Sequence, residues 1–277
     1  NIPMSPYQKK VYEHFENIEQ LMELQRSKSY SSFSTYRSYT RQSSNFVFPV
    51  MTNNLTGESR PRPNHYKITD KDAEKLLEHK DKKLQLDKDA IKKQVINNYL
   101  NAINTYILEL EKYFDKIAEN DKKTGKSIEK DISVFKNEYK MKFTEFWTNY
   151  KNKSSLLESL YSSSCKIVAI LFGIYRSLGP TLVYSNYVRI EGLEVFKIYM
   201  KYFGYNNYNS NKGRDYFRYT EYHGGIKDRD EREKNRKAFN DKHNIKGKLI
   251  KIILISPAGS EGISLYNIRQ VHIMEPY

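Results

Sequence analysis

The stretch KLIKIILISPAGSEGISLYNIRQVHIMEPY, residues 248–277, decides the fold. Residues 249–255 form a nearly continuous apolar run, rich in β-branched residues and too short for a membrane span, which is typical of a strand covered on both faces. The run stops at Ser256-Pro257, because proline cannot continue the hydrogen bonds of a strand. We therefore predict a central parallel strand, then a loop, then a second short strand over 271–274.

The loop between these two strands is the candidate site. Ligands of open α/β sheets bind in the crevice at the carboxyl ends of the strands, and glycines let a backbone approach phosphate or sugar closely. This loop begins at Ser256 and contains Gly259 and Gly262, with Ser260 and Glu261 between them. The sequence therefore predicts a phosphate- or sugar-binding loop.

The composition favours a polyanionic partner. The chain has 47 Lys and Arg against 33 Asp and Glu, a formal charge of +14, which indicates nucleic acid before membrane. Its 277 residues suit about two domains, or one domain with a large insertion. The single cysteine, Cys165, excludes an internal disulfide and fits a reducing compartment. No signal peptide or membrane-length apolar stretch is visible, and because the chain begins at Asn1 without methionine we expect a fragment.

Helical periodicity dominates the first half of the chain. Apolar residues at helical spacing predict a helix over about 5–26 and a long helix over about 91–117. A further helix is predicted over about 127–150, which would form an antiparallel hairpin with the long one. Residues 27–44 are rich in Ser, Tyr and Arg without a period, so we predict an irregular or mobile segment. Its Tyr and Arg could stack on bases, but a solvated loop is the preferred interpretation.

One apparent motif is set aside. Thr124-Gly125-Lys126-Ser127 matches the end of a phosphate-binding Walker loop. The motif requires a glycine where this chain has Asn120, and a strand where this chain has a predicted helix. We therefore interpret it as a turn.

From Ser154 onward, predicted strands and helices alternate. We expect helices over about 155–178, 193–203 and 228–241, and strands over 181–184 and 217–222. Repeated strand–helix–strand units with right-handed crossovers imply a mostly parallel sheet flanked by helices. The predicted class is therefore α/β, with a large helical insertion over 60–153.

Several motifs in this order resemble the second RecA-like domain of superfamily 2 helicases and translocases, close to the Snf2-like branch. They are Leu182-Val183-Tyr184-Ser185 (motif IV), His223-Gly224 with Arg232 and Phe239 (motif IVa), and residues 256–265, SPAGSEGISL (motif V). Gln8 and Tyr12 resemble the Q-x-x-x-Y helix of Snf2-like enzymes, and residues 41–49, RQSSNFVFP, resemble the stretch that follows it. The amino-acid sequence of these motifs is most similar to that of poxvirus-type helicases of nucleocytoplasmic large DNA viruses, including their early transcription factor subunit and nucleoside triphosphatase.

The resemblance covers roughly half of the chain and implies a division into three parts. Residues 1–59 would belong to the second RecA-like lobe, 60–153 would be an insertion, and 154–277 would be the second RecA-like domain, ending before motif VI.

The resemblance also implies roles for the loop residues. Nucleic-acid contacts would come from Ser185, Asn186, Ser256, Ala258, Gly259 and Ser260, and nucleotide contacts from Glu261, Gly262 and Ser264. His223 and Gly224 would shape the adjoining loop. Structural alternatives stay open, because the two glycines would also permit a strained turn and Ser256 would also cap a strand end. No catalytic residue or metal ligand is expected in this piece.

ATP and Mg²⁺ would be held mainly by the first RecA-like domain of the same protein. The implied function is an ATP-dependent helicase or translocase acting on DNA or RNA, serving viral transcription in the virion or host cytoplasm, with a viral RNA polymerase as a partner. We expect the fragment alone to be inactive. The alternative is a degenerate, non-catalytic RecA-like module that docks on DNA or polymerase. These residues do not indicate whether the protein unwinds nucleic acid or only translocates on it, with which polarity it moves, or whether it acts on DNA or RNA.

Overall fold

The apolar run at 249–255 forms the middle of a parallel sheet. In the computed structural model, which describes residues 2–27, 38–66, 68, 90–210, 214–224, 226, 228–257 and 262–275, the sheet has the order β2-β3-β4-β1-β5 and every pairing is parallel. The strands are β1 (Thr181–Tyr184), β2 (Asn206–Asn207), β3 (Arg218–Tyr222), β4 (Ile252–Ile255) and β5 (Gln270–Ile273). All four residues of β4 are buried. The predicted α/β class and the central strand are confirmed.

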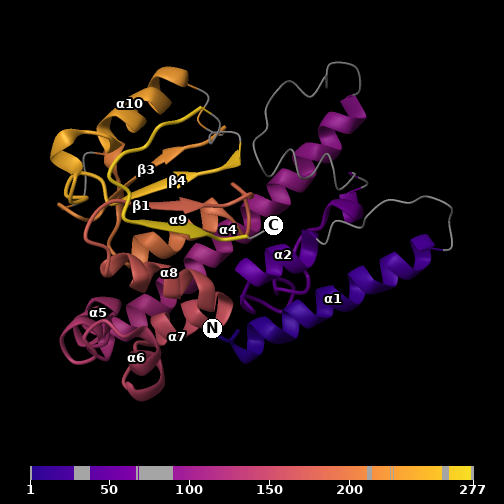
Figure 1. Cartoon of the computed structure of the whole chain (residues 1–277). Helices are drawn as coiled ribbons and strands as arrows, with labels where there is room; N and C mark the ends of the chain where they lie inside the picture. The colour runs from indigo at the N-terminus through magenta and orange to yellow at the C-terminus, as the bar shows by residue number, and fades with distance from the viewer. Residues whose placement is uncertain are drawn as a thin grey trace.

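The helices cover both faces of this sheet (Figure 1). Alternate residues of a strand point to opposite faces. Ile253 and Ile255 pack with Phe239 of α10 (Arg229–Phe239), whereas Ile252 and Leu254 join the larger core on the other face. That larger core includes α8 (Cys165–Tyr175) and α9 (Leu193–Tyr202). Single turns of 3-10 helix lie at Pro63–Tyr66, Tyr208–Ser210 and Lys242–Asn244.

The helix predicted over 155–178 is wrong in one respect, because it is two helices. α7 (Ser155–Ser163) and α8 are bent by 118° at Ser164. The Ser164 hydroxyl accepts a hydrogen bond from the Ile167 N–H and donates to the Asn45 carbonyl, so the side chain starts a new helix instead of continuing the old one. No single helix in the described ranges is long and apolar enough to span a membrane; α7 and α8 reach that length and composition only as this bent pair.

The N-terminal segment contains a helix where the sequence predicted irregular structure. α1 (Pro6–Ser27) is confirmed, but Ser38–Asn45 forms α2, and residues 28–37 lie outside the described residues. The Glu19 carboxylate of α1 accepts hydrogen bonds from the Tyr39 N–H at 2.7 Å and the Thr40 hydroxyl at 2.8 Å. A carboxylate at a helix N-terminus stabilises the free N–H groups there. α2 therefore depends on a cap that is distant in sequence, and local periodicity does not reveal it.

The predicted long helix is confirmed as α4 (Ala90–Lys123), but the hairpin is not formed. The helix predicted over 127–150 is split into α5 (Ile128–Asn137) and α6 (Phe143–Asn149), with positive φ at Lys140 and Met141 between them. These helices contact α7 and α8 rather than running back along α4. The break lets the rings of Phe135 and Phe146 both pack on Phe172 of α8, with centroids 4.7 and 5.2 Å away.

The Thr124–Ser127 stretch is a turn, as predicted. Gly125 has φ +72°, and the Ser127 hydroxyl accepts a hydrogen bond from the Lys130 N–H as the N-cap of α5. The motif thus joins two helices and does not follow a strand.

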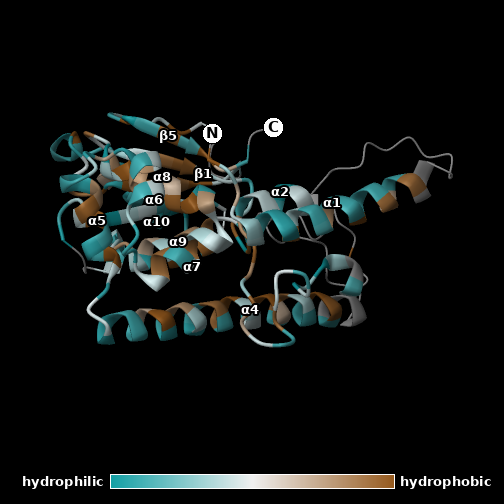
Figure 2. Cartoon of the chain, turned by 90° about the horizontal axis from the view of Figure 1, so that it is seen from below, coloured by the Kyte–Doolittle hydropathy of each residue, from teal (hydrophilic) through white to brown (hydrophobic). Residues whose placement is uncertain are grey.

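The helices of the middle section share one core with the sheet. Figure 2 shows α4 running beneath α7 and α9 with its apolar side turned toward them. The apolar residues buried along the described part of α4 are Ile96, Tyr99, Ile103, Tyr106, Leu110 and Phe114. They belong to the same hydrophobic cluster as Val183 and Leu254 of the sheet. The division of the chain at residues 60 and 153 stays a prediction.

Candidate nucleic-acid and nucleotide site

The carboxyl ends of the strands bring several predicted site residues together. Tyr184 of β1 is opposite Ile255 of β4, and the Ser185 N–H donates to the Ile255 carbonyl at 3.1 Å. Ser185-Asn186 and Ser256 therefore lie at the same edge of the sheet. This is the edge at which open α/β sheets bind ligands.

Ser185 and Asn186 are held by a carboxylate that sequence reasoning missed. Glu275, which follows β5, accepts a hydrogen bond from the Ser185 hydroxyl at 2.7 Å and from the Asn186 N–H at 2.6 Å. Ser185 has no exposed surface and Asn186 is 3% exposed. Both residues are thus positioned by Glu275, and their contact with nucleic acid stays a prediction.

Glu275 belongs to a buried polar cluster that also contains Asn45 and Lys166. The Asn45 side-chain amide donates to Glu275 and to the Glu191 carbonyl, and the Lys166 ammonium donates to the Asn45 Oδ1 and the Met274 carbonyl, both at 2.8 Å. Burial raises the pKa of the Glu275 carboxyl and lowers the pKa of Lys166. The cluster ties α2 and α8 to the ends of β1 and β5.

The residues that the resemblance assigned to the first helices serve the same connection. Gln8 of α1 is completely buried, donates to the Ser43 carbonyl at 3.1 Å and accepts from the Cys165 N–H at 3.3 Å. Gln8 and Asn45 therefore join α1, α2 and α8 behind the site. The sequence signal for this role was present in the Q-x-x-x-Y and RQSSNFVFP stretches, but not the contacts themselves.

A fully buried ion pair anchors the loop after β1. The Arg60 guanidinium contacts the Glu191 carboxylate through two hydrogen bonds of 2.5 Å, with the side chains 1% and 3% exposed. Arg62, also buried, shares Gln42 Oε1 with Arg60 and lies 3.9 Å from the Phe15 ring centroid. The segment at 60–62 thus fixes the loop that contains Asn186.

The end of β3 carries a second buried polar set. His223 Nε2 lies 2.8 Å from Glu221 Oε2, which also accepts from Lys197 at 3.1 Å. Burial acts to raise the pKa of the Glu221 carboxyl, but the His223 hydrogen bond and the Lys197 charge outweigh it and hold the pKa below its usual value. His223 is buried, and its role in shaping the loop stays a prediction.

The centre of the predicted motif V loop is not tested. Ala258, Gly259, Ser260 and Glu261 lie outside the described residues. Before them, Ser256 is fully buried, and its hydroxyl has no hydrogen-bond partner in the described part of the chain.

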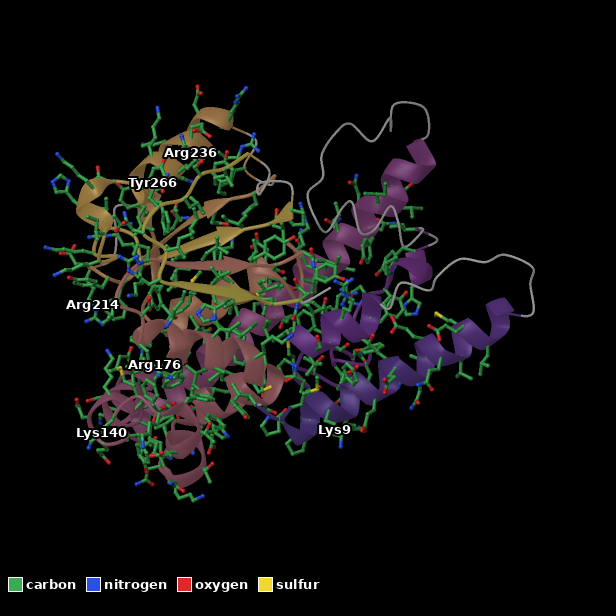
Figure 3. All side chains as sticks on the ribbon, in the orientation of Figure 1. Lys9, Lys140, Arg176, Arg214, Arg236 and Tyr266 are labelled. Atoms are coloured by element: carbon green, nitrogen blue, oxygen red, sulfur yellow. The ribbon has the colours of Figure 1, made fainter. Side chains whose placement is uncertain are left out.

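After the loop centre, Gly262 and Ser264 are both exposed. Gly262 has φ +72°, and a Cβ added there would meet nothing within 4 Å, so backbone conformation rather than space selects glycine. Asn240, at the end of α10, donates to the Ser264 carbonyl at 2.8 Å and accepts from the Tyr266 N–H at 2.9 Å. The segment at 264–266 is therefore fastened to the end of α10, near the labelled Tyr266 in Figure 3.

No cluster that would hold a metal ion is present in the described ranges. No three or more His, Cys, Asp or Glu side chains come together there.

The strand order and the helices define the structural class of the protein. A five-stranded parallel sheet with helices on both faces is an α/β fold consistent with a RecA-like domain. No protein-family model matches the chain.

Particular relatives are viral. A protein of Acanthamoeba polyphaga mimivirus, named as a putative ATP-dependent RNA helicase, is 41% identical over 280 residues, which cover all of this chain and 33% of that protein. A second mimivirus protein of the same name is 37% identical over 114 residues, or 41% of this chain and 20% of that protein. A termination factor NPH-I homolog of African swine fever virus is 33% identical over 150 residues, or 42% of this chain and 21% of that protein.

The chain thus spans about a third of the length of the first mimivirus relative. The names of these relatives confirm the predicted resemblance to viral helicases. The assignment to the Snf2-like branch and to the second RecA-like domain stays a prediction.

Proposed function

We propose that this chain is the second RecA-like lobe of a viral ATP-dependent helicase or translocase that acts on nucleic acid. The main support is the similarity of the whole chain to a mimivirus protein with such a name. The parallel sheet, which places Ser185 and Ser256 at its carboxyl edge, agrees with it.

In this proposal the predicted site residues are divided between two ligands. Ser185, Asn186, Ser256, Ala258, Gly259 and Ser260 contact the nucleic-acid backbone, and Glu261, Gly262 and Ser264 contact the nucleotide. The buried Ser256 hydroxyl is a donor that a phosphate oxygen would satisfy. Glu275 positions Ser185 and Asn186 from behind, and Asn240 positions Ser264.

ATP and Mg²⁺ are held chiefly by the first RecA-like lobe in this proposal. ATP hydrolysis therefore requires the full-length protein, and the 277-residue chain alone turns over no ATP above background. A role in viral transcription extends this proposal, and the African swine fever virus relative, which is named as a termination factor homolog, supports that role. An RNA polymerase partner is a further extension of the same proposal.

The test is the nucleic-acid-stimulated ATPase activity of the full-length protein with Gly262→Val. Valine strongly disfavours φ +72°, so the segment that faces the nucleotide must change its conformation. Gly125→Val is a matched control, because Gly125 has the same φ and lies in the turn between α4 and α5. We expect stimulated turnover in the wild type and in the control, and its loss in Gly262→Val.

Equal turnover in the two valine variants would contradict the proposal that the segment at Gly262 contacts the nucleotide. An intact protein that binds nucleic acid or polymerase, yet shows no stimulated turnover, would be the non-catalytic docking module instead.

A further inference from the structure

Two adjoining cavities lie at the amino end of the sheet, opposite the site described above. Their volumes are about 420 and 230 Å³, and they share Lys136, Tyr175 and Phe217 as lining residues. Phe217 immediately precedes β3, and Lys251, which lines the larger cavity, immediately precedes β4. Lys136 comes from α5, so the cavities form where the middle helices meet the sheet.

The cavities concentrate positive charge. Lys136, Lys246 and Lys251 line the larger one, and Arg214 lines the smaller one. In the described part of the chain, no ion pair joins any of these four cations to a carboxylate.

Neighbouring carboxylates do not cancel this charge. Glu129 lines the smaller cavity, and Asp215 is engaged with Arg218 and Lys248, each at 3.4 Å. Burial lowers the pKa of Lys136, and it lowers the pKa of Lys251 to about 8. An anion that entered the cavity would therefore supply a counter-charge that these lysines lack.

Two of the cations are paired with aromatic rings that line the cavities. The Lys136 ammonium lies 4.4 Å from the Tyr175 ring centroid, and the Arg214 guanidinium carbon lies 4.1 Å from the Phe217 ring centroid. Tyr216, which also lines the larger cavity, has φ +67° and is 44% exposed. A tyrosine in the left-handed region is unusual, and such strain concentrates at functional positions.

We infer that the two adjoining cavities together bind single-stranded nucleic acid, with a base stacked on Tyr216 and phosphates held by Lys136, Lys246 and Arg214. Proteins that bind single strands without reading sequence combine a groove of cations with aromatic rings on which bases stack. Arg214, Arg176 and Lys140 project from the same side of the molecule in Figure 3, so positive charge continues away from the cavity. The site is separate from the carboxyl edge and needs neither ATP nor the motif V loop.

The experiment measures binding of the 277-residue chain, without ATP, to labelled oligo(dT) and oligo(U) of about 12 nucleotides by fluorescence anisotropy. Tyr216→Gly removes the stacking ring and is compatible with folding, because glycine adopts positive φ without strain. We expect about tenfold weaker binding from this change. Arg214→Ala should weaken binding and reduce the slope of log affinity against log salt by about 0.7.

Lys9→Ala is the matched control for charge, because Lys9 lies on α1, far from the cavity in Figure 3. It should bind like the wild type. Affinities within twofold of the wild type for both Tyr216→Gly and Arg214→Ala would overturn the inference. Tighter binding of an acidic peptide of equal charge would also overturn it, by indicating a protein ligand. Because the assay contains no ATP, its outcome is independent of whether the motor proposal holds.

Discussion

Arg60→Met tests how strongly the buried Arg60–Glu191 pair stabilises the fold. The substitution removes the two hydrogen bonds of 2.5 Å to Glu191 and leaves that carboxylate buried without its partner. It also removes the hydrogen bonds of Arg60 to the Pro61 carbonyl and to Gln42 Oε1. Hydrogen bonds to charged groups contribute about 1.5–3 kcal/mol each, and breaking a buried ion pair costs about 3–5 kcal/mol. Burial, with repulsion from Arg60, lowers the pKa of Arg62 to about 9, so loss of Arg60 relieves part of the cost. We therefore expect a loss of about 3 kcal/mol.

Urea unfolding followed by circular dichroism measures this loss, and a double-mutant cycle with Glu191→Gln isolates the pair. The coupling energy should reach about 2 kcal/mol or more. Lys201→Met is the comparison, since its pair with Asp115 is 52% and 48% exposed and should contribute less than about 1 kcal/mol. If Arg60→Met costs no more than Lys201→Met, the reasoning from burial is refuted.

Three further outcomes are expected. Burial raises the pKa of the Asp131 carboxyl to about 6, so the folded state binds this proton more tightly than the unfolded state does. The free energy of unfolding should therefore fall by up to about 3 kcal/mol as pH rises from 4 to 7. Urea unfolding of Asp131→Asn at several pH values should lack this decrease. Glu19→Ala should cost about 1–2 kcal/mol and speed hydrogen exchange at Tyr39 and Thr40, which lose their acceptor. Phe172→Ala should cost about 3–5 kcal/mol in a single cooperative melting transition; two separate transitions would contradict the shared core.

The parts of the fold that were predictable from the sequence are those with a local signal. β1 was predicted at its observed bounds, and α4 followed from a stripe of apolar residues. In each case burial on one element produces a short-range period. The break at Ser164 was not predicted, because Ser164 has no glycine or proline signal and its hydroxyl bonds to Asn45 of another helix.

The candidate site, too, was predictable only where adjacent strands bring residues together. The register of β1 and β4 places Ser185 beside Ser256, as expected for residues that follow adjacent parallel strands. Glu275 escaped prediction because it lies 90 residues from Ser185, and the Arg60–Glu191 pair spans 131 residues. Such pairings follow from the path of the whole chain, which no local spacing encodes.

The strand order has a consequence for folding during synthesis. β1 lies between β4 and β5, and Thr181 bonds to Lys251, 70 residues later. At about 5–20 residues per second, β1 waits between about 4 and 14 seconds for its first neighbour. The helices α4, α7 and α8 precede β1 in the chain and share its core, so they are available to cover Val183 during that interval. These helices can therefore protect the apolar residues of β1 from water and from aggregation until β4 and β5 have been synthesised and can pair with it.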